Sequence, residues 1–294
     1  MTSVSDAFDA CRRRLEITKT EQADASRRQK EVRANVQEDF HVQTDFLTGS
    51  YARSTKTKPL KDVDIFVVLG DRELDRRSSS PRSVLDAFET SLTSHYGATA
   101  TTRGRRSISV EFDRSSPTKD EDGKVISIDI VPAFEAGDVY EIPDDILGEW
   151  IQTNPKVHKE KSTAKNAELA GSWVPLVKML KAWNREAGKP IKPSFLIEVM
   201  ALDLVDAPFN DYASEVRSFF AAAGDAISET WADPAGLGPP VSDQMTAERC
   251  SEARLALYEA EKLCAQAARA EERGKTGASI AIWRQLFGPY FPAS

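Results

Sequence analysis

The hydrophobic pattern is most informative around residues 62–69. An apolar run over residues 63–69, broken only by Asp64, predicts a buried strand, and the acidic residues Asp62 and Asp64 lie at its beginning. Because side chains two apart on a strand point to one face, we expect Asp62 and Asp64 to project together while the apolar side chains pack behind them. Two neighbouring carboxylates repel each other unless cations lie between them.

A second strand carries a third acid. The segment 124–132 alternates strictly, with isoleucines on one face and Ser127, Asp129 and Val131 on the other. Asp is depleted in strands, so all three acids oppose local propensity, and departures of this kind cluster at functional sites. A plainer interpretation has Asp62 and Asp64 capping a strand end and Asp129 on a solvated face. The complete set favours catalysis.

The rest of the pattern predicts an α+β fold with two lobes. Residues 4–38 carry one thin apolar stripe, which predicts a long helix that braces the lobes, with a break near residues 18–23. Strands and one helix follow, and helices dominate after Pro143. We therefore expect an N-terminal bridging helix (1–38), a core lobe with a mixed β-sheet (39–142) and a helical lobe (143–294).

Caps and breakers predict the individual elements. The serines at 78–80 introduce a predicted helix over 81–95, and the acidic link 120–123 joins two strands, near 107–113 and 125–131, in a predicted hairpin. Clusters of Gly and Pro at 188–190 and 236–240 help to separate four predicted helices, near residues 163–187, 193–206, 210–226 and 244–287.

Composition limits the classes of function. At 294 residues and 40% hydrophobic content, the chain can bury one large core or two modest ones. The net charge of −7 disfavours long nucleic acid as a partner. The scattered cysteines and histidines argue against a disulfide framework and a zinc site. No apolar run could span a bilayer and the N-terminus is not signal-like, so we expect a cytoplasmic protein without membrane contact.

A small-residue turn precedes the first two acids. Gly49 would let backbone amides approach a phosphate, and the Ser50 hydroxyl could donate to a phosphate oxygen. Thr55 and the lysines at 56, 58 and 61 could add donors, although a solvated loop is the favoured interpretation of each lysine. Mg²⁺ is usually held by one or two carboxylates, substrate phosphate oxygens and water, so the turn and the acids together indicate a nucleoside triphosphate handled on metal ions.

These motifs resemble those of the DNA polymerase beta superfamily of nucleotidyltransferases. The segments "LTGSYARSTKTKPLKDVDIFVVL" and "ISIDIVPAF" are most similar to those of the bacterial CD-NTases, the cGAS/DncV-like enzymes. The resemblance continues through "EWIQTNPKVH", "LVKMLKAWN", "IKPSFLIEVM" and "IAIWRQLFGPYFP". It implies a two-lobed polymerase-beta-like fold whose helical lobe closes the nucleotide cleft.

The resemblance also implies roles for further residues. In similar enzymes the lysine matching Lys181 reaches the donor triphosphate, whereas a lysine beside an apolar helix face usually snorkels to water. Ser194 would contact phosphate, and Phe195, otherwise a core residue, would stack on the donor base. Thr153 and Asn154 match the segment that meets the acceptor base, and an amide can both donate to and accept from a base edge.

The implied reaction joins nucleotides. A 2′- or 3′-hydroxyl would attack the α-phosphate of a second NTP, with Asp62 and Asp64 holding two Mg²⁺ or Mn²⁺ ions and Asp129 holding the acceptor-side ion and orienting or deprotonating the hydroxyl. From ATP and other NTPs, the product would be a cyclic di- or trinucleotide, or a linear oligonucleotide, for anti-phage signalling in CBASS systems. Regulatory proteins and a downstream effector that binds the product are the implied partners; the sequence does not specify the oligomeric state.

Two alternatives stay open. An enzyme that nucleotidylates a protein, an antibiotic or an RNA end would share the acids and differ in its acceptor pocket, and the lack of a strongly basic tail argues mildly against RNA. A catalytically silent nucleotide-binding regulatory module would be expected to lose at least one carboxylate, but Asp62, Asp64 and Asp129 are all present.

Overall fold

The computed structural model describes residues 3–112 and 127–293. Two compact units make up the chain. The sheet unit comprises Ile17–Lys159 and Ala235–Gly238, and the helical unit comprises Met1–Glu16, Glu160–Pro234 and Pro239–Ser294. The boundaries of these units therefore fall at other residues than the expected 38/39 and 142/143.

A mixed sheet forms the centre of the sheet unit. Its strands, in the described part of the chain, are β1 (Val42–Thr48), β2 (Asp62–Leu69), β3 (Thr101–Arg103), β4 (Ile108–Glu111), β5 (Ser127–Ala136), β6 (Val139–Asp144) and β7 (Glu149–Thr153). The order is β1-β2-β5-β4-β3, with β6 pairing to the far end of β5 and β7 pairing to β6. Only the β2–β5 pair is parallel among these ladders.

The predicted pairing of the strands near residues 107–113 and 125–131 is confirmed, because β4 runs antiparallel to β5. The acidic link at 120–123 and Ile126 lie outside the described residues. Two further isoleucines, Ile128 and Ile130, are fully buried, as the alternation predicts.

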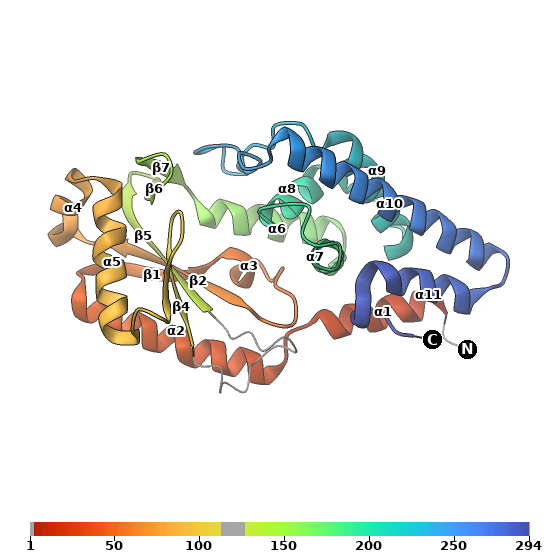
Figure 1. The fold of residues 1–294 in the computed structure, drawn as a ribbon, viewed down its shortest axis with the longest axis horizontal. Helices are drawn as coiled ribbons and strands as arrows, with labels where there is room; N and C mark the ends of the chain where they lie inside the picture. Colours follow the sequence, from red (N-terminus) through yellow and green to blue (C-terminus); the bar gives the residue numbers. More distant parts are fainter. Residues whose placement is uncertain (1–2, 113–126, 294) are drawn as a thin grey trace. The chain divides into compact units, whose positions relative to one another are not determined.

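Helices α2 (Lys19–Asp39) and α5 (Pro81–Tyr96) cover one face of this sheet, as Figure 1 shows. Their apolar side chains form one core with the residues of β2 that point away from the aspartates. The expected helix over 81–95 is confirmed, and the Ser80 hydroxyl accepts a hydrogen bond from the Ser83 amide at 3.2 Å at its start. A cap of this kind satisfies one of the amides that the first helical turn leaves unpaired.

The opposite face of β2 changes from acidic to apolar along the strand. Phe66 and Val68, on the same face as Asp64, are almost fully buried. The Phe66 ring packs against Phe46 at 5.1 Å and against Tyr140 at 5.2 Å between ring centroids. The acids therefore lie where this face stops being core.

The helical unit holds most of the remaining helices. They are α1 (Val4–Leu15), α7 (Trp173–Glu186), α8 (Phe195–Leu204), α9 (Tyr212–Ala226), α10 (Ala247–Glu272) and α11 (Thr276–Phe287), while α6 (Pro155–Glu168) begins in the sheet unit and continues into the helical unit. Short helical turns complete the set: α3 (Gly49–Ala52), η1 (Asp71–Glu73), α4 (Leu74–Ser78) and η2 (Gly288–Tyr290). Within the described residues, no helix combines the length and the apolar character that crossing a membrane requires.

The N-terminal stretch, predicted as a long helix with a break, forms two separate helices. The chain leaves the helix after Leu15 and begins α2 at Lys19, slightly before the expected break at 18–23. Thr18 and Glu21 form a reciprocal cap: the Thr18 amide donates to the Glu21 carboxylate at 2.6 Å, and the Glu21 amide donates to the Thr18 hydroxyl at 3.1 Å. The two helices belong to different compact units.

The expected start of helical structure after Pro143 is wrong. The sheet continues through β7, and the first helix of this half begins at Pro155. The predicted helices 163–187 and 244–287 are each interrupted, at Gly171 and Gly274, where the backbone has positive φ. The positive φ at each glycine is a backbone feature that apolar periodicity does not reveal, so the pattern alone does not separate the helices.

Candidate active site

Strand pairing brings the three acids to one face of the sheet. Asp64 and Asp129 are direct partners in the parallel β2–β5 ladder, and Asp62 lies two residues earlier on β2. Ser109 on β4 is the antiparallel partner of Asp129 on its other side. Asp129 therefore lies between Asp64 and Ser109 in one row across three strands. A neighbouring row ends in Glu111, so four carboxylates share this face.

The Gly49 turn packs directly against this row. Gly49 follows β1 and begins the short helix α3, with φ at +62°. A Cβ atom placed on Gly49 would overlap the Asp64 carboxylate and would lie 3.1 Å from the Asp64 Cβ. Positive φ and this close approach both require glycine. The turn predicted to cradle phosphate and the acid predicted to hold metal are therefore adjacent.

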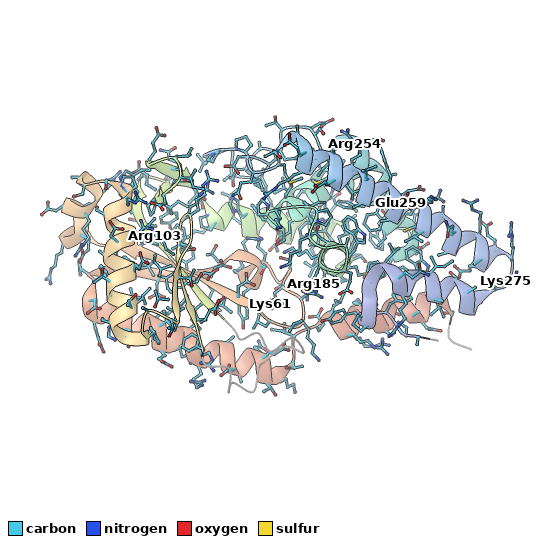
Figure 2. The ribbon with its side chains drawn as sticks, in the orientation of Figure 1. Lys61, Arg103, Arg185, Arg254, Glu259 and Lys275 are labelled. Atoms are coloured by element: carbon cyan, nitrogen blue, oxygen red, sulfur yellow. The ribbon has the colours of Figure 1, made fainter. Side chains whose placement is uncertain are left out.

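The loop after Gly49 is closed by its own backbone. The Ser50 carbonyl accepts hydrogen bonds from the amides of Thr55 at 3.0 Å and Lys56 at 3.2 Å. The Lys56 ammonium lies 4.1 Å from the centre of the Tyr51 ring, in a cation–π contact. Lys61, labelled in Figure 2, precedes Asp62, and its carbonyl accepts the Ser127 amide at 2.7 Å.

Asp129 is electrostatically unusual. Burial raises the pKa of its carboxyl to about 6; the Ser109 hydroxyl, which donates to Oδ1 at 2.5 Å, opposes this rise, and the charges of Asp62 and Glu111 add to it. In the absence of a cation the cluster therefore holds a carboxyl that protonates close to neutral pH. Neither Ser109 nor Glu111 was identified from the sequence, although both lie on the polar face of an alternating strand.

The donor set fits Mg²⁺ by its chemistry. Carboxylate oxygens are the ligands that this ion prefers, and Asp62, Asp64 and Asp129 present theirs on one face beside a turn where only glycine fits. Among residues 3–112 and 127–293, no three His, Cys, Asp or Glu side chains already surround a point as a closed metal site would. Mg²⁺ commonly takes only one or two carboxylates, so this arrangement suits an ion that arrives with substrate phosphate oxygens.

The two proposed base contacts differ in their surroundings. Thr153 is the β7 partner of Tyr140, whose ring packs against Phe66 on the acid-bearing face. Asn154 uses its amide within the protein: Nδ2 donates to the Asp138 carbonyl at 3.1 Å, and Oδ1 accepts the Lys156 amide at 3.2 Å. It acts as a cap for α6, a role that Asn followed by Pro at a helix start signals.

The three donor-side residues lie in the helical unit. The Lys181 ammonium is paired with the Glu198 carboxylate at 2.5 Å, and Glu198 is only 1% exposed. Ser194 is exposed at the N-cap of α8 and makes no side-chain cap bond to the helix. Phe195 is half-buried against the helical core. The sequence reading missed Glu198, which the short motif "PSFLIE" contains.

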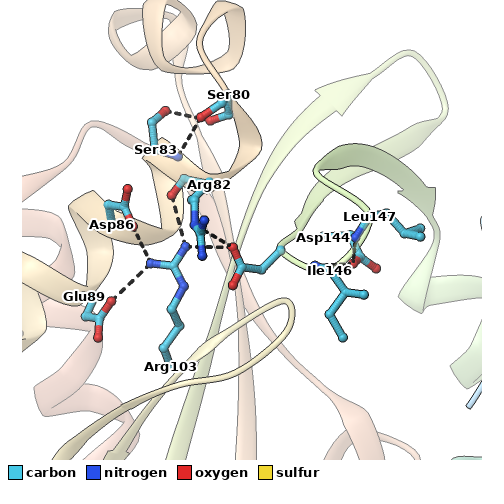
Figure 3. A network of polar contacts seen from close by, with 10 residues as sticks. Ser80, Arg82, Ser83, Asp86, Glu89, Arg103, Asp144, Ile146 and Leu147 are labelled. Carbon is cyan, nitrogen blue, oxygen red and sulfur yellow. Dashed lines mark hydrogen bonds and ion pairs between the residues drawn. The ribbon is translucent and has the colours of Figure 1, made fainter.

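The basic turn at residues 103–106 has structural partners (Figure 3). Arg103 bonds to Asp86, Glu89 and Asp145, which fixes the turn to α5 and to the β6–β7 turn. Its neighbours Arg105 and Arg106 both reach the fully buried Asp144 carboxylate, at 2.9 and 2.8 Å.

Asp144 is held in its charged form. Burial alone would raise its pKa, but the bonds from Arg105, the Leu147 amide and Arg106 outweigh it and lower the pKa to about 2. Asp144 therefore anchors the loop that leads into β4 and Ser109.

Comparison with known proteins agrees with this geometry. Residues 1–166 match the model of the Second Messenger Oligonucleotide or Dinucleotide Synthetase domain. The chain is 31% identical over 274 residues to a cyclic AMP-AMP-AMP synthase of an Acinetobacter species, covering 86% of this chain and 74% of that protein.

The fold is similar to that of E. coli MS115-1 CdnC, solved with ATP (TM-score 0.74) and in a complex with a HORMA protein (TM-score 0.71). Each comparison has 18% identity and covers 98% of both chains. The family model and the Acinetobacter relative settle the membership: this chain belongs to the Second Messenger Oligonucleotide or Dinucleotide Synthetase family, the CD-NTases, and is a nucleotidyltransferase of the cyclic oligonucleotide synthase class.

Proposed function

We propose that this protein joins NTPs into a cyclic oligonucleotide, with release of pyrophosphate, at the acid-bearing face of the sheet unit. The observation that carries the proposal is the contact of Gly49 with Asp64, which itself lies beside Asp129. Phosphate oxygens bound at the Gly49 turn would be next to the carboxylates.

The residues of this face have different proposed roles. The Gly49 and Ser50 turn binds and orients the triphosphate. Asp62 and Asp64 would hold Mg²⁺ or Mn²⁺, which when bound would neutralise phosphate charge and clamp the attacking and leaving oxygens. Asp129 lies beside Asp64, where its carboxylate would hold the acceptor-side ion, orient the attacking hydroxyl and accept its proton.

Residues of the helical unit would bind the donor nucleotide. Ser194 offers an exposed hydroxyl at the start of α8, and Phe195 is accessible enough to stack on a base. Lys181 would exchange part of its bond to Glu198 for triphosphate oxygens. Because Glu198 is almost fully buried, that exchange has an electrostatic cost.

We further propose that adenine nucleotides enter the product and that a protein partner regulates the enzyme. The Acinetobacter relative is a cyclic AMP-AMP-AMP synthase, and the structurally similar CdnC was solved with a HORMA protein. An anti-phage signalling role, with an effector that binds the product, follows from the family and is part of the same proposal.

The test is to incubate purified protein with each NTP and with all pairs, in Mg²⁺ or Mn²⁺, and to identify products by mass spectrometry. We expect pyrophosphate and a phosphatase-resistant cyclic product from mixtures that contain ATP. Products attached to an added protein, an aminoglycoside or an RNA 3′ end, without any cyclic species, would instead support a different acceptor.

A further inference from the structure

We infer that Ser109 is a positioning residue that holds the Asp129 carboxylate in its working orientation. The inference rests on the proposed function, because it takes Asp129 as the acid on the acceptor side. Ser109 belongs to none of the motifs that indicated the reaction, and it reaches Asp129 through strand pairing alone.

The geometry of the row defines what Ser109 does. Asp129 has Asp64 as its partner on β2 and Ser109 as its partner on β4. The Ser109 hydroxyl donates to Oδ1 of Asp129 at 2.5 Å, a short bond to a charged acceptor. Because the two oxygens of a carboxylate diverge from one carbon, fixing Oδ1 toward β4 directs Oδ2 away from β4. That orientation leaves one oxygen for the hydroxyl and the ion.

Without this bond, repulsion from neighbouring acids would favour rotation of the Asp129 carboxylate away from them. Asp129 is half-buried, and the neighbouring charges of Asp62 and Glu111 both have its sign. Like charges at close range repel strongly where water is partly excluded. A fixed donor on the β4 side counteracts this repulsion and limits side-chain rotation, which is how a supporting hydrogen bond orders a reactive group.

Ser109 is itself well anchored. Three residues earlier, Arg106 bonds to the fully buried Asp144 carboxylate at 2.8 Å. The Gly104 amide donates to the Ser107 carbonyl at 2.8 Å and closes the turn between β3 and β4. The strand that carries the hydroxyl is therefore fixed at the end from which it starts.

The sharpest test compares Ser109→Thr with Ser109→Val. These side chains have the same shape and differ in a hydroxyl, and strands tolerate both. We expect Ser109→Thr to keep kcat within about 3-fold of wild type and Ser109→Val to lower it about 10- to 100-fold, as loss of a bond to a charged group implies. The KM for NTP should change little in either variant, because the triphosphate is bound elsewhere.

The matched control is Ser127→Ala, on the same face of β5. The Ser127 hydroxyl donates to the Lys61 carbonyl at 3.3 Å, so its removal takes away a hydroxyl without touching Asp129. Melting temperatures of all variants show whether the fold is kept. If Ser109→Val does not fold, Ser109→Ala takes its place in the comparison with Ser109→Thr.

A second measurement does not depend on turnover. Mn²⁺ binding in the presence of a non-hydrolysable ATP analogue, followed by electron paramagnetic resonance, should be weakened several-fold in Ser109→Val and kept in Ser109→Thr. Equal kcat and equal Mn²⁺ affinity in the Val and Thr variants would overturn the inference, as would a Thr variant as defective as Val. Absence of product from wild type would count against the proposed function, while the Mn²⁺ comparison would still decide the role of Ser109.

Discussion

Gly49 and Asp64 lie so close that any side chain on Gly49 would displace the Asp64 carboxylate. The turn that follows β1 and Asp64, the third residue of β2, are therefore a single structural unit. A substitution at Gly49 changes the site twice, through its positive φ of +62° and through Asp64.

Gly49→Ala should reduce NTP turnover by about 100-fold or more, because it moves Asp64 as well as the phosphate-binding backbone. The matched control is Gly137→Ala, at a turn with φ of +69° and no atom within 4 Å of the added Cβ. That control should cost about 1 kcal/mol of stability, from the backbone strain alone, and keep activity. Equal turnover in the two variants would show that displacement of Asp64 does not matter.

The raised pKa of Asp129 predicts a pH-dependent stability in metal-free protein. The folded state holds a proton on Asp129 up to about pH 6, whereas the unfolded chain releases it near the usual aspartate pKa of 3.8. Protonated Asp129 therefore makes its full contribution to the free energy of unfolding below the unfolded-state pKa. This contribution, about 3 kcal/mol, is lost as the pH rises through about 6.

Asp129→Asn removes this titration, so its advantage over wild type should grow between pH 4 and pH 7 by about that amount. Urea denaturation of both proteins in a chelator, across this range, measures the difference. A stability difference that stays constant with pH would mean that the Asp129 pKa is not raised. Mg²⁺ should diminish the advantage, since only the carboxylate form of wild type binds it well.

Lys181 has two candidate roles that one series of variants separates. Lys181→Met leaves Glu198 buried without this cation, so it should lose about 3–5 kcal/mol of stability as well as NTP affinity. The double variant Lys181→Met with Glu198→Gln should recover most of the stability. If Lys181 contacts the triphosphate, the double variant should still have a raised KM for NTP. Recovery of both stability and NTP affinity would show that Lys181 has only a structural role.

Base selection is tested at Thr153 and Asn154. Asn154→Ala also removes the cap of α6, so Asn154→Ser, which keeps a capping oxygen, is the better probe of the base edge. We expect Asn154→Ser and Thr153→Ala to change which nucleotides are incorporated more than the total yield. The measurement is a pairwise panel of radiolabelled NTPs. Unchanged product ratios in both variants would place base selection elsewhere.

The sequence predicted best what strand periodicity controls. Alternation placed Asp62, Asp64 and Asp129 on strands with buried opposite faces, and the parallel ladder then made Asp64 and Asp129 neighbours. The mixed sheet, the helix beginning at Pro81 and the family were also predictable. The functional roles of the site residues stay predictions until the variants are measured.

Features created by tertiary contact were not predictable from local pattern. Glu198 is the partner of Lys181 because two helices of the helical unit pack together. Ser109 is the partner of Asp129 because their strands are adjacent in the sheet. The break before α2 lies earlier than the apolar stripe predicts, because the Thr18 capping box begins α2 at Lys19.

The most direct test of the central claim combines Asp62→Asn with Asp64→Asn. Each change keeps side-chain volume and removes charge from a repelling cluster, so the variant should fold with an unchanged or higher melting temperature. Pyrophosphate release from ATP-containing NTP mixtures with Mg²⁺, followed by enzyme-coupled assay, should be abolished in the variant and present in wild type. Turnover near that of wild type in a folded double variant would contradict the assignment of this face as the metal-dependent active site.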